Sequence, residues 1–369
     1  MRRPSLLVGV WIVVSLIACT GTSSESTPQT GPVVSAGVST SSGAPTPRPV
    51  VDPASFDPRN AVVPGFVPRA VLFLDEDHGV LGGRIECPKR CEGQHDGILA
   101  ATDDGGATWK LTRRIKTPIT HLTANPGTGA IWATASTCDY FLEGCGRWLL
   151  RSVDEGTTWT TKRDWVVNPA FATADLGFGA GTELRDGLHI QSSAITRDGG
   201  KTWGTQPGPC GGEQNMTVGF SFPSSDLGWA ACASSEPGAG FFQFKAVYRT
   251  TDGGASWATT ARFSPGDRLG SGLWANGGAL GIHMFADGNG FFWAGGGFAY
   301  LVRTADGGHT WRTVWEDPGG GTEELSDISW LDPTDAFAVR WRASFGWDVA
   351  RTRDGGRRWS SVIRWPTHD

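Results

Sequence analysis

An eight-residue phrase that ends in tryptophan recurs six times along the chain, and this repeat restricts the possible folds more than any other feature. Each copy begins with Ser or Thr and carries Asp at its third position, Gly at its fifth and Trp at its eighth, as in TTDGGASW. Consecutive tryptophans lie 44 to 54 residues apart, a near-constant period typical of repeat architectures. The aspartates are Asp104, Asp154, Asp198, Asp252, Asp306 and Asp354, and the tryptophans are Trp109, Trp159, Trp203, Trp257, Trp311 and Trp359.

The residue types of this phrase, called the clamp below, suit a tight turn followed by a strand. An Asp side chain can accept hydrogen bonds from backbone N–H groups two residues further on, and the Ser or Thr hydroxyl adds a second local bond. The glycines tolerate a positive φ at which other residues would clash. The Trp begins the next strand, where its ring can be buried against a neighbouring repeat.

An apolar strand, an acidic or glycine turn and a second apolar strand precede the clamps, as in AVLFLDEDHGVLGG from residue 70. Each repeat therefore holds four short strands, a to d, with the clamp between c and d. Such units cannot bury their own faces, so they predict an all-β, six-bladed β-propeller of four-stranded antiparallel blades. Seven blades are the alternative, because residues 260–280 could hide a blade without a clamp. Residues 61–68 are a candidate extra strand that closes the ring beside the last blade.

The clamp resembles the Asp-box of the BNR-repeat proteins, a family that includes sialidases, sortilin-type receptors, and photosystem II assembly and stability factors. The resemblance covers roughly residues 70–365 and implies a propeller, but the box is shared by enzymes and non-enzymes. The phrases FLDEDHGVLGG and DLGWAACA look most like the assembly factors. Two clamps depart from the pattern, with Glu155 at a usual glycine and Arg358 at a usual Ser or Thr, and neither change is expected to disturb the turn.

The first 60 residues predict export and anchoring rather than part of the propeller. Two arginines precede the apolar run LLVGVWIVVSLIA, which is too short for a comfortable membrane span. The following LIAC resembles the lipobox of bacterial lipoproteins, so residues 1–18 are interpreted as a signal peptide and Cys19 as the lipidated N-terminus; an ordinary signal peptide is the alternative. Residues 19–60, rich in Ser, Thr, Pro and Gly, are interpreted as a disordered tether, and residues 61–369 as the propeller. We expect an exported protein, lipid-anchored on the outer side of a bacterial cell membrane.

The chain direction separates two faces of the expected ring. If the clamps lie on a lower face, the a-b turns share that face, and the b-c loops and d-a connections form an upper face. The acidic residues that recur in the a-b turns then lie beside the clamp aspartates, and we interpret them as residues that stabilise these turns. Polar and aromatic residues of the upper loops form the candidate binding face, represented by Arg84, Trp148, Arg185, Arg340, Trp341 and Arg342.

Six cysteines remain once Cys19 is set aside, and an exported domain with six cysteines favours three disulfides. Pairing of sequence neighbours places all three on the upper face. The phrase CPKRCEGQHD could instead hold a metal, but no second pair of this kind and no HxH or HExxH spacing is present, so we expect neither metal nor cofactor. The expected pairs are Cys87 with Cys91, Cys138 with Cys145, and Cys210 with Cys232.

Three classes of function compete. A sialidase-like glycoside hydrolase would need an arginine triad, a Tyr nucleophile paired with Glu, and an Asp acid/base. The Arg-Ile-Pro phrase usual in sialidases is missing, and the one Tyr with a Glu close by in the sequence is Tyr140, with Glu143. We therefore expect no catalytic residue. We expect a non-catalytic scaffold that presents its upper face to an envelope protein; a module that binds an envelope glycan is the alternative. Interspersed charges with a net charge of -5 argue against nucleic acid. We expect a monomer that contacts the membrane through its lipid anchor alone.

Overall fold

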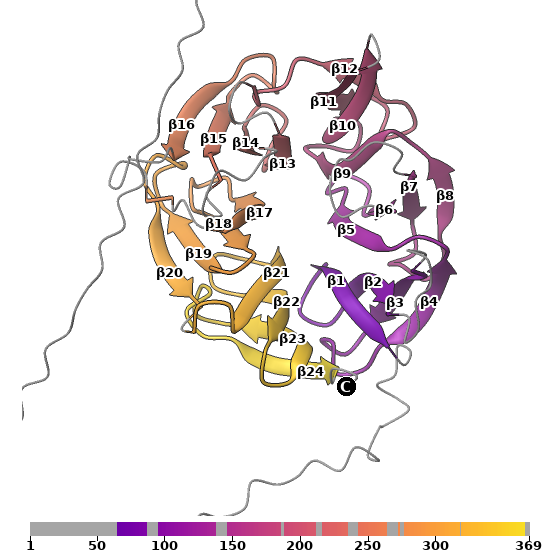
Figure 1. Cartoon of the computed structure of the whole chain (residues 1–369). Helices are drawn as coiled ribbons and strands as arrows, with labels where there is room; N and C mark the ends of the chain where they lie inside the picture. The colour runs from indigo at the N-terminus through magenta and orange to yellow at the C-terminus, as the bar shows by residue number, and fades with distance from the viewer. Residues whose placement is uncertain are drawn as a thin grey trace, which may run out of the picture. The chain divides into compact units, whose positions relative to one another are not determined.

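The fold is a six-bladed β-propeller, as predicted. The chain divides into residues 1–52 and residues 53–369, and every described residue belongs to the second unit. In these residues 24 strands form six four-stranded antiparallel sheets that surround a centre (Figure 1), so the seven-bladed alternative is wrong. None of the described residues forms a helix, and none therefore forms a helix able to span a membrane. The computed structural model describes residues 65–86, 95–137, 146–185, 188–211, 216–234, 243–263, 272–273, 277–317 and 319–365.

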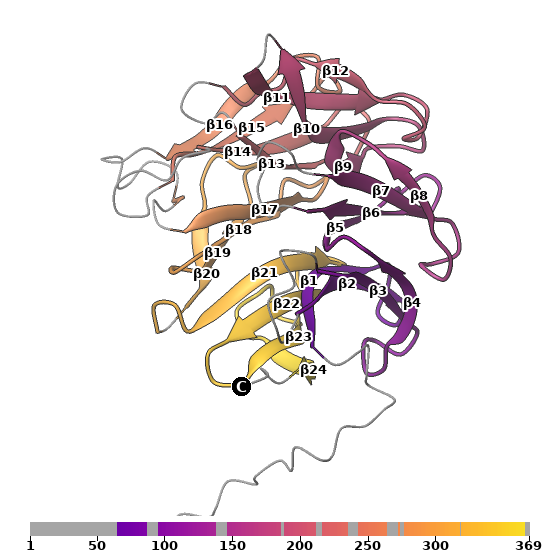
Figure 2. The same cartoon turned by 45° about the vertical axis from the view of Figure 1, so that its right-hand side comes forward.

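Each blade uses four consecutive strands, with the first innermost and the fourth on the outside of the ring (Figures 1 and 2). Blades one to three are β1 (Phe66–Phe73), β2 (Gly79–Ile85), β3 (Gly97–Thr102), β4 (Lys110–Ile115); β5 (Ile119–Ala124), β6 (Ile131–Ser136), β7 (Arg147–Ser152), β8 (Thr160–Arg163); and β9 (Val166–Phe171), β10 (Gly177–Arg185), β11 (Leu188–Thr196), β12 (Gly204–Gln206). Blades four to six are β13 (Met216–Ser221), β14 (Gly228–Ala233), β15 (Lys245–Thr250), β16 (Ala258–Phe263); β17 (Gly278–Met284), β18 (Gly290–Gly295), β19 (Tyr300–Thr304), β20 (Arg312–Glu316); and β21 (Glu323–Trp330), β22 (Ala336–Arg342), β23 (Gly346–Thr352), β24 (Ser360–Trp365).

The middle strands of the blades are buried on both faces, because neighbouring blades cover both sides of each sheet. Strands β6, β14 and β18 are buried at every position, and each combines small residues with one or more aromatic ones. The outer strand β8, with the sequence TTKR, is exposed throughout. Burial therefore falls from the middle of each blade to the rim of the ring.

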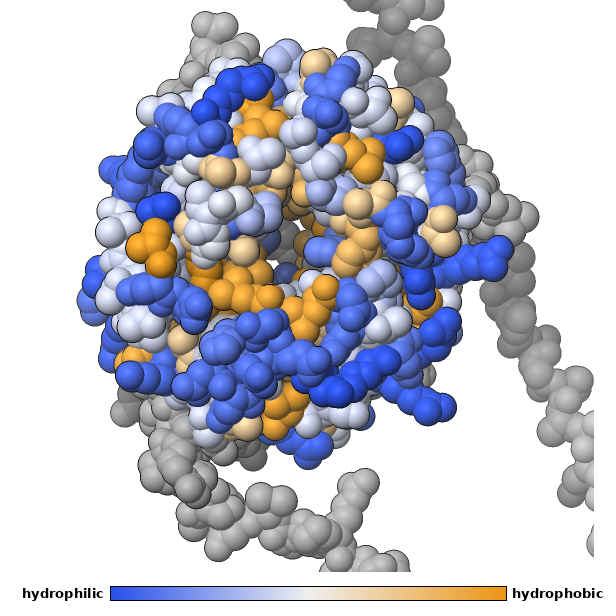
Figure 3. All heavy atoms as spheres, turned by 180° about the vertical axis from the view of Figure 1, so that it is seen from behind, coloured by the Kyte–Doolittle hydropathy of each residue, from blue (hydrophilic) through white to orange (hydrophobic). Residues whose placement is uncertain are grey.

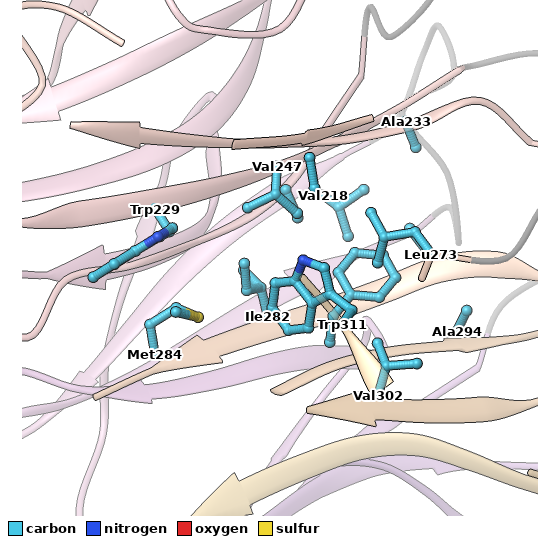
Figure 4. Close-up of a cluster of buried hydrophobic side chains, with 14 of the residues drawn as sticks. Val218, Trp229, Ala233, Val247, Leu273, Ile282, Met284, Ala294, Val302 and Trp311 are labelled. Atoms are coloured by element: carbon cyan, nitrogen blue, oxygen red, sulfur yellow. The ribbon is translucent and has the colours of Figure 1, made fainter. Parts of the chain in front are cut away.

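The clamp tryptophans pack into the preceding blade. Trp311 of blade five lies in one buried cluster with Val218, Trp229 and Val247 of blade four (Figure 4). Trp109 of blade one packs in the same way against the last blade. The remaining clamp tryptophans also join a cluster of the blade before them. Each clamp thus helps to hold two blades together, which agrees with the packing role expected for its ring.

The clamp at Asp252 shows how this turn is held. Oδ1 of Asp252 accepts hydrogen bonds from the hydroxyl of Thr250 at 2.7 Å and from the amide of Ser256 at 2.9 Å, and Oδ2 accepts from the hydroxyl of Ser256 at 2.6 Å. The aspartate therefore spans four residues rather than the two expected. The hydroxyl of Thr250 also accepts from the amide of Gly254 at 2.9 Å, which closes the turn.

The two unusual clamps keep this turn in different ways. Glu155 adopts a φ of 55°, in the left-handed region where Gly253 and Gly307 have 66° and 72°. The amide of Arg358 still donates to Asp354, at 2.9 Å, although Arg358 has no hydroxyl to supply the second bond.

The clamps and the a-b turns lie on one face of the ring. The amide of Gly105 in a clamp donates to the carbonyl of Asp77 in an a-b turn, and blades three to six have equivalent bonds. The b-c loops and d-a connections therefore lie on the other face, as expected. Figure 3 shows one face of the ring, with an opening at its centre, apolar residues beside the opening and a hydrophilic rim.

Side chains close the ring between blades one and six. The predicted extra strand at residues 61–68 is wrong in its described part, because Phe66–Pro68 belongs to β1, the innermost strand of blade one; residues 61–64 lie outside the described residues. Blade six already has its own outer strand, β24, so it needs no strand from elsewhere. The rings of Phe73 and Phe337 stack across the boundary with centroids 3.5 Å apart, and the amide of Phe73 donates to Ser329 Oγ at 2.8 Å.

Candidate functional site

The predicted binding-face residues lie in four blades and differ in what they contact. Arg84 is the second-last residue of β2, and its Nη2 lies 3.6 Å from Glu86 Oε1. Trp148 is half-buried against the core between blades one and two. Arg185 ends β10, and its side chain lies outside the described part. Blade six supplies the other three residues, and these lie close together.

Arg340 lies inside blade six rather than on an exposed face. Its Nε and Nη2 donate to both carboxylate oxygens of Asp348, at 3.0 and 2.6 Å, and its Nη1 donates to Glu323 at 3.0 Å. Nη2 also donates to Ser361, so one guanidinium joins all four strands of the blade. Burial opposes the charge, but the bonds and charges of Asp348 and Glu323 outweigh it and raise the pKa of Arg340. The expected ligand role of Arg340 is therefore replaced by a structural one.

Two other arginines of blade six lie over one aromatic ring at the upper end of the sheet. The guanidinium of Arg342 is 5.0 Å and that of Arg364 is 4.6 Å from the ring centre of Phe345, which lies in the b-c turn. Trp341 and Trp347 are paired neighbours on β22 and β23. These five residues, Trp341, Arg342, Phe345, Trp347 and Arg364, are called the blade-six patch below.

The buried network positions the blade-six patch. Glu323, fixed by Arg340, also lies 3.5 Å from Nε of Arg342. Arg69 of blade one lies 5.8 Å above the Trp347 ring and so connects the patch to the ring closure. Because cation and ring are already in contact, less side-chain freedom is lost when a partner binds.

Sequence reasoning missed Phe345 and Arg364. Phe345 belongs to a turn that reads as polar loop, ASFG, and Arg364 lies on the outer strand, opposite Asp348 in the strand register. The b, c and d strands of one blade are consecutive in the sequence, and their register places Arg364 in one row with Asp348 and Arg340, on the face of the sheet that also carries Arg342.

One predicted disulfide lies within the described residues. Cys210 and Cys232 are bonded, with Cα atoms 5.4 Å apart, at the upper end of blade four. Cys87, Cys91, Cys138 and Cys145 lie outside the described residues, as does Cys19. No group of His, Cys, Asp and Glu side chains in the described part is arranged to hold a metal ion.

The titratable residues of the described part mostly serve the fold. Burial lowers the pKa of His121 and of His283 to about 4, so both rings are neutral at pH 7. Of the tyrosines considered as nucleophiles, Tyr248 and Tyr300 are buried in core clusters, and Tyr140 lies outside the described residues. Asp327 has a raised pKa, but it accepts a backbone hydrogen bond across the ring closure.

Comparison with known proteins places the chain by its fold. No protein-family model and no curated protein matches the sequence. The GH93 α-L-arabinofuranosidase of Fusarium graminearum has a TM-score of 0.54 at 13% identity, over 79% of this chain and 93% of that one. A Penicillium chrysogenum α-L-arabinanase has a TM-score of 0.51 at 13% identity, over 81% and 94%. YCF48 from Cyanidioschyzon merolae has a TM-score of 0.45 at 17% identity, over 83% and 88%. At such identities the similarity shows the fold alone.

Proposed function

We propose that this protein is a non-catalytic binding scaffold that holds a protein partner through the upper face of its propeller. The observation that supports this proposal is the blade-six patch, where two arginines lie over the ring of Phe345 on one face of the sheet end, and Trp341 and Trp347 pair on the other face. Arginine and tryptophan are enriched among residues that dominate the energy of protein interfaces. A guanidinium stacked on a ring also keeps its planar fork free to bind a carboxylate in two places.

The partner that fits the patch is a protein segment with exposed carboxylates beside an apolar side chain. Arg342 and Arg364 supply the charge, and Trp341 and Trp347 supply the half-buried aromatic surface. Arg340 forms ion pairs with Glu323 and Asp348 inside the blade, so it is not one of the residues that contact the partner.

Cross-linking in intact cells tests this proposal. The wild-type protein is compared with Arg342→Ala/Arg364→Ala, and the matched control Lys110→Ala/Arg113→Ala removes two exposed cations from β4. One protein recovered in near-equal amount, lost in the patch variant and kept in the control, supports the scaffold. Equal recovery by all three proteins contradicts a role for the patch.

A carbohydrate-binding role is the second candidate, because Trp341 and Trp347 offer neighbouring aromatic surfaces. Recovery of an envelope glycan without any protein in the same experiment would favour it. In that case Trp341→Ala should abolish retention of the glycan, whereas Arg364→Ala should weaken it less.

We further propose that the protein is a BNR-repeat lipoprotein, exported and anchored through Cys19 to the outer side of a bacterial membrane. The lipobox-like LIAC and the clamp repeat support this proposal. Metabolic labelling with a palmitate analogue should label the wild type and not Cys19→Ser. Equal labelling of both would contradict the anchor.

A further inference from the structure

A groove lies between blades two and three, away from the blade-six patch. It is an open groove of about 560 Å³ that adjoins a second hollow of about 400 Å³, and Lys162 and Lys201 line both. Blade two contributes its outer strand β8, and blade three contributes its clamp. The first part is lined by Arg147, Lys162, Arg163, Asp164, Trp165, Lys201, Thr202 and Trp203.

The groove is cationic in a chain of net charge -5. Four of the eight lining side chains are Arg or Lys, and one, Asp164, is an acid. Asp164 is almost fully buried and is paired with Lys162 at 2.8 Å, whereas Arg163 and Lys201 lie exposed at the edge of the groove.

The residues that follow the clamps differ at this boundary from those at several others. The third residue after each clamp Trp faces the next blade, and at the boundary between blades one and two it is Thr112, whose hydroxyl accepts a hydrogen bond from Trp159 Nε1 at 3.3 Å. At two other boundaries it is valine packed into a core cluster, Val314 or Val362. In blade two it is Lys162, whose Nζ instead donates to the carbonyl of Lys201 at 3.0 Å. Nε1 of Trp203, the clamp Trp at this boundary, is buried without a hydrogen-bond partner, as is Nε1 of Trp257 in the next clamp.

Two half-buried indole rings line the same groove. Trp203 packs from below against the cluster of Trp132 and Leu149. Trp165 lies against the backbone of β10 at Gly181, where a Cβ would come within 2.3 Å of its ring. Rigid indole faces beside cations suit a flat, polar ring that carries an anion, and the volume suits one or two sugar units.

We propose that this groove binds an anionic saccharide, a sugar ring that carries a carboxylate or a phosphate. Arg163 and Lys201, exposed at its edge, contact the anion, and Trp165 and Trp203 contact the ring. The site is separate from the blade-six patch, so it stands whether or not the scaffold proposal holds.

Titration of the purified propeller with digalacturonate, followed by tryptophan fluorescence and calorimetry, tests the site. Glucose 6-phosphate serves as the phosphate probe, and the neutral digalactoside and glucose serve as uncharged controls. We expect saturable binding of at least one anionic probe, about tenfold or more tighter than its neutral counterpart and weaker at high salt. The anionic probe that binds identifies the anion as carboxylate or phosphate.

A matched pair of variants assigns the binding to the groove. Arg163→Ala/Lys201→Ala removes two exposed cations at its edge, and Arg113→Ala/Arg357→Ala removes cations at the equivalent positions of blades one and six. The first variant should lose about tenfold or more in affinity, and the second should bind like the wild type. Absence of saturable binding by both anionic probes, equal binding of the neutral sugars, or equal loss in both variants would overturn the proposal.

Discussion

The amide of Val71 in blade one donates a hydrogen bond of 2.9 Å to Asp327 Oδ2 in blade six, and this bond joins the first and last blades. Burial raises the pKa of Asp327 to about 7, although hydrogen bonds from the amides of Val71 and Ile328 act in the opposite direction. The closure of the ring therefore contains a carboxyl group that titrates near neutral pH.

Asp327→Asn should make the stability of the propeller less dependent on pH. The folded carboxyl holds its proton up to about pH 7, whereas the unfolded one loses it near pH 3.8, so the folded state binds more protons between these values. Stability from this group must therefore fall as pH rises from 4 to 7. Asn can still accept the Val71 amide without becoming charged. Thermal unfolding at pH 5, 6, 7 and 8 should show that the melting temperature of the variant increases relative to that of the wild type as pH rises. A constant difference between the two melting temperatures would contradict the raised pKa.

The clamp aspartates should give the opposite dependence. Hydrogen bonds from Ser256, through its hydroxyl and then its amide, and from Thr250 lower the pKa of Asp252 to about 2. The stability from this carboxylate is present above pH 3.8 and is lost as pH falls toward 2. Asp252→Asn should destabilise the protein at pH 6, and the difference from the wild type should shrink by pH 2. A difference of constant size across this range would show that ionisation of Asp252 is not involved.

Glu155→Gly should stabilise the second clamp. Glu155 has a positive φ that costs a residue with a Cβ about 1–2 kcal/mol, and the extra freedom of glycine in the unfolded chain offsets about half of that. The net gain should be about 0.5–1 kcal/mol, measurable as a rise in melting temperature. The reverse change in blade five, Gly307→Glu, has space for the side chain and should cost a similar amount, which isolates the backbone effect. Stabilisation by both changes would contradict this explanation.

Arg340→Met should destabilise the protein more strongly than any single change in the blade-six patch. It leaves Asp348, which is fully buried, without its counter-charge, and such a loss costs about 3–5 kcal/mol. Arg340→Met/Asp348→Leu removes both charges and should recover much of the stability in denaturant unfolding. If the single and double variants were equally unstable, lost packing rather than the unpaired carboxylate would be the cause.

Much of the fold follows from the clamp alone, because a turn and a packing tryptophan repeated at a fixed period define both the blades and their boundaries. The position of each clamp between strands c and d also placed Cys210 and Cys232 at one end of blade four, where they are bonded. The closure of the ring was harder to predict. It depends on whether blade six completes its own sheet, and β24 carries no signal that distinguishes it from an unpaired outer strand.

The candidate site was predicted only in part. Residues 340 and 342 are both arginine and lie two positions apart on one strand, yet Arg340 is buried and Arg342 is half-exposed. The difference lies in Asp348, eight residues further on, which faces Arg340 across the b-c turn. Lys162 lines both parts of the groove, and the contrast between Lys162 and the equivalent Thr112 and Val362 appears only when the outer strands are aligned by their clamps.

Blades one and six meet without a shared strand. Every sheet is one uninterrupted segment, so all six boundaries depend on side-chain contacts and none on strand exchange. Cutting the polypeptide between blades three and four, and linking residue 365 to residue 65, would leave each sheet whole. A circularly permuted protein of this kind should regain the same ring, because no blade has a privileged place as first or last.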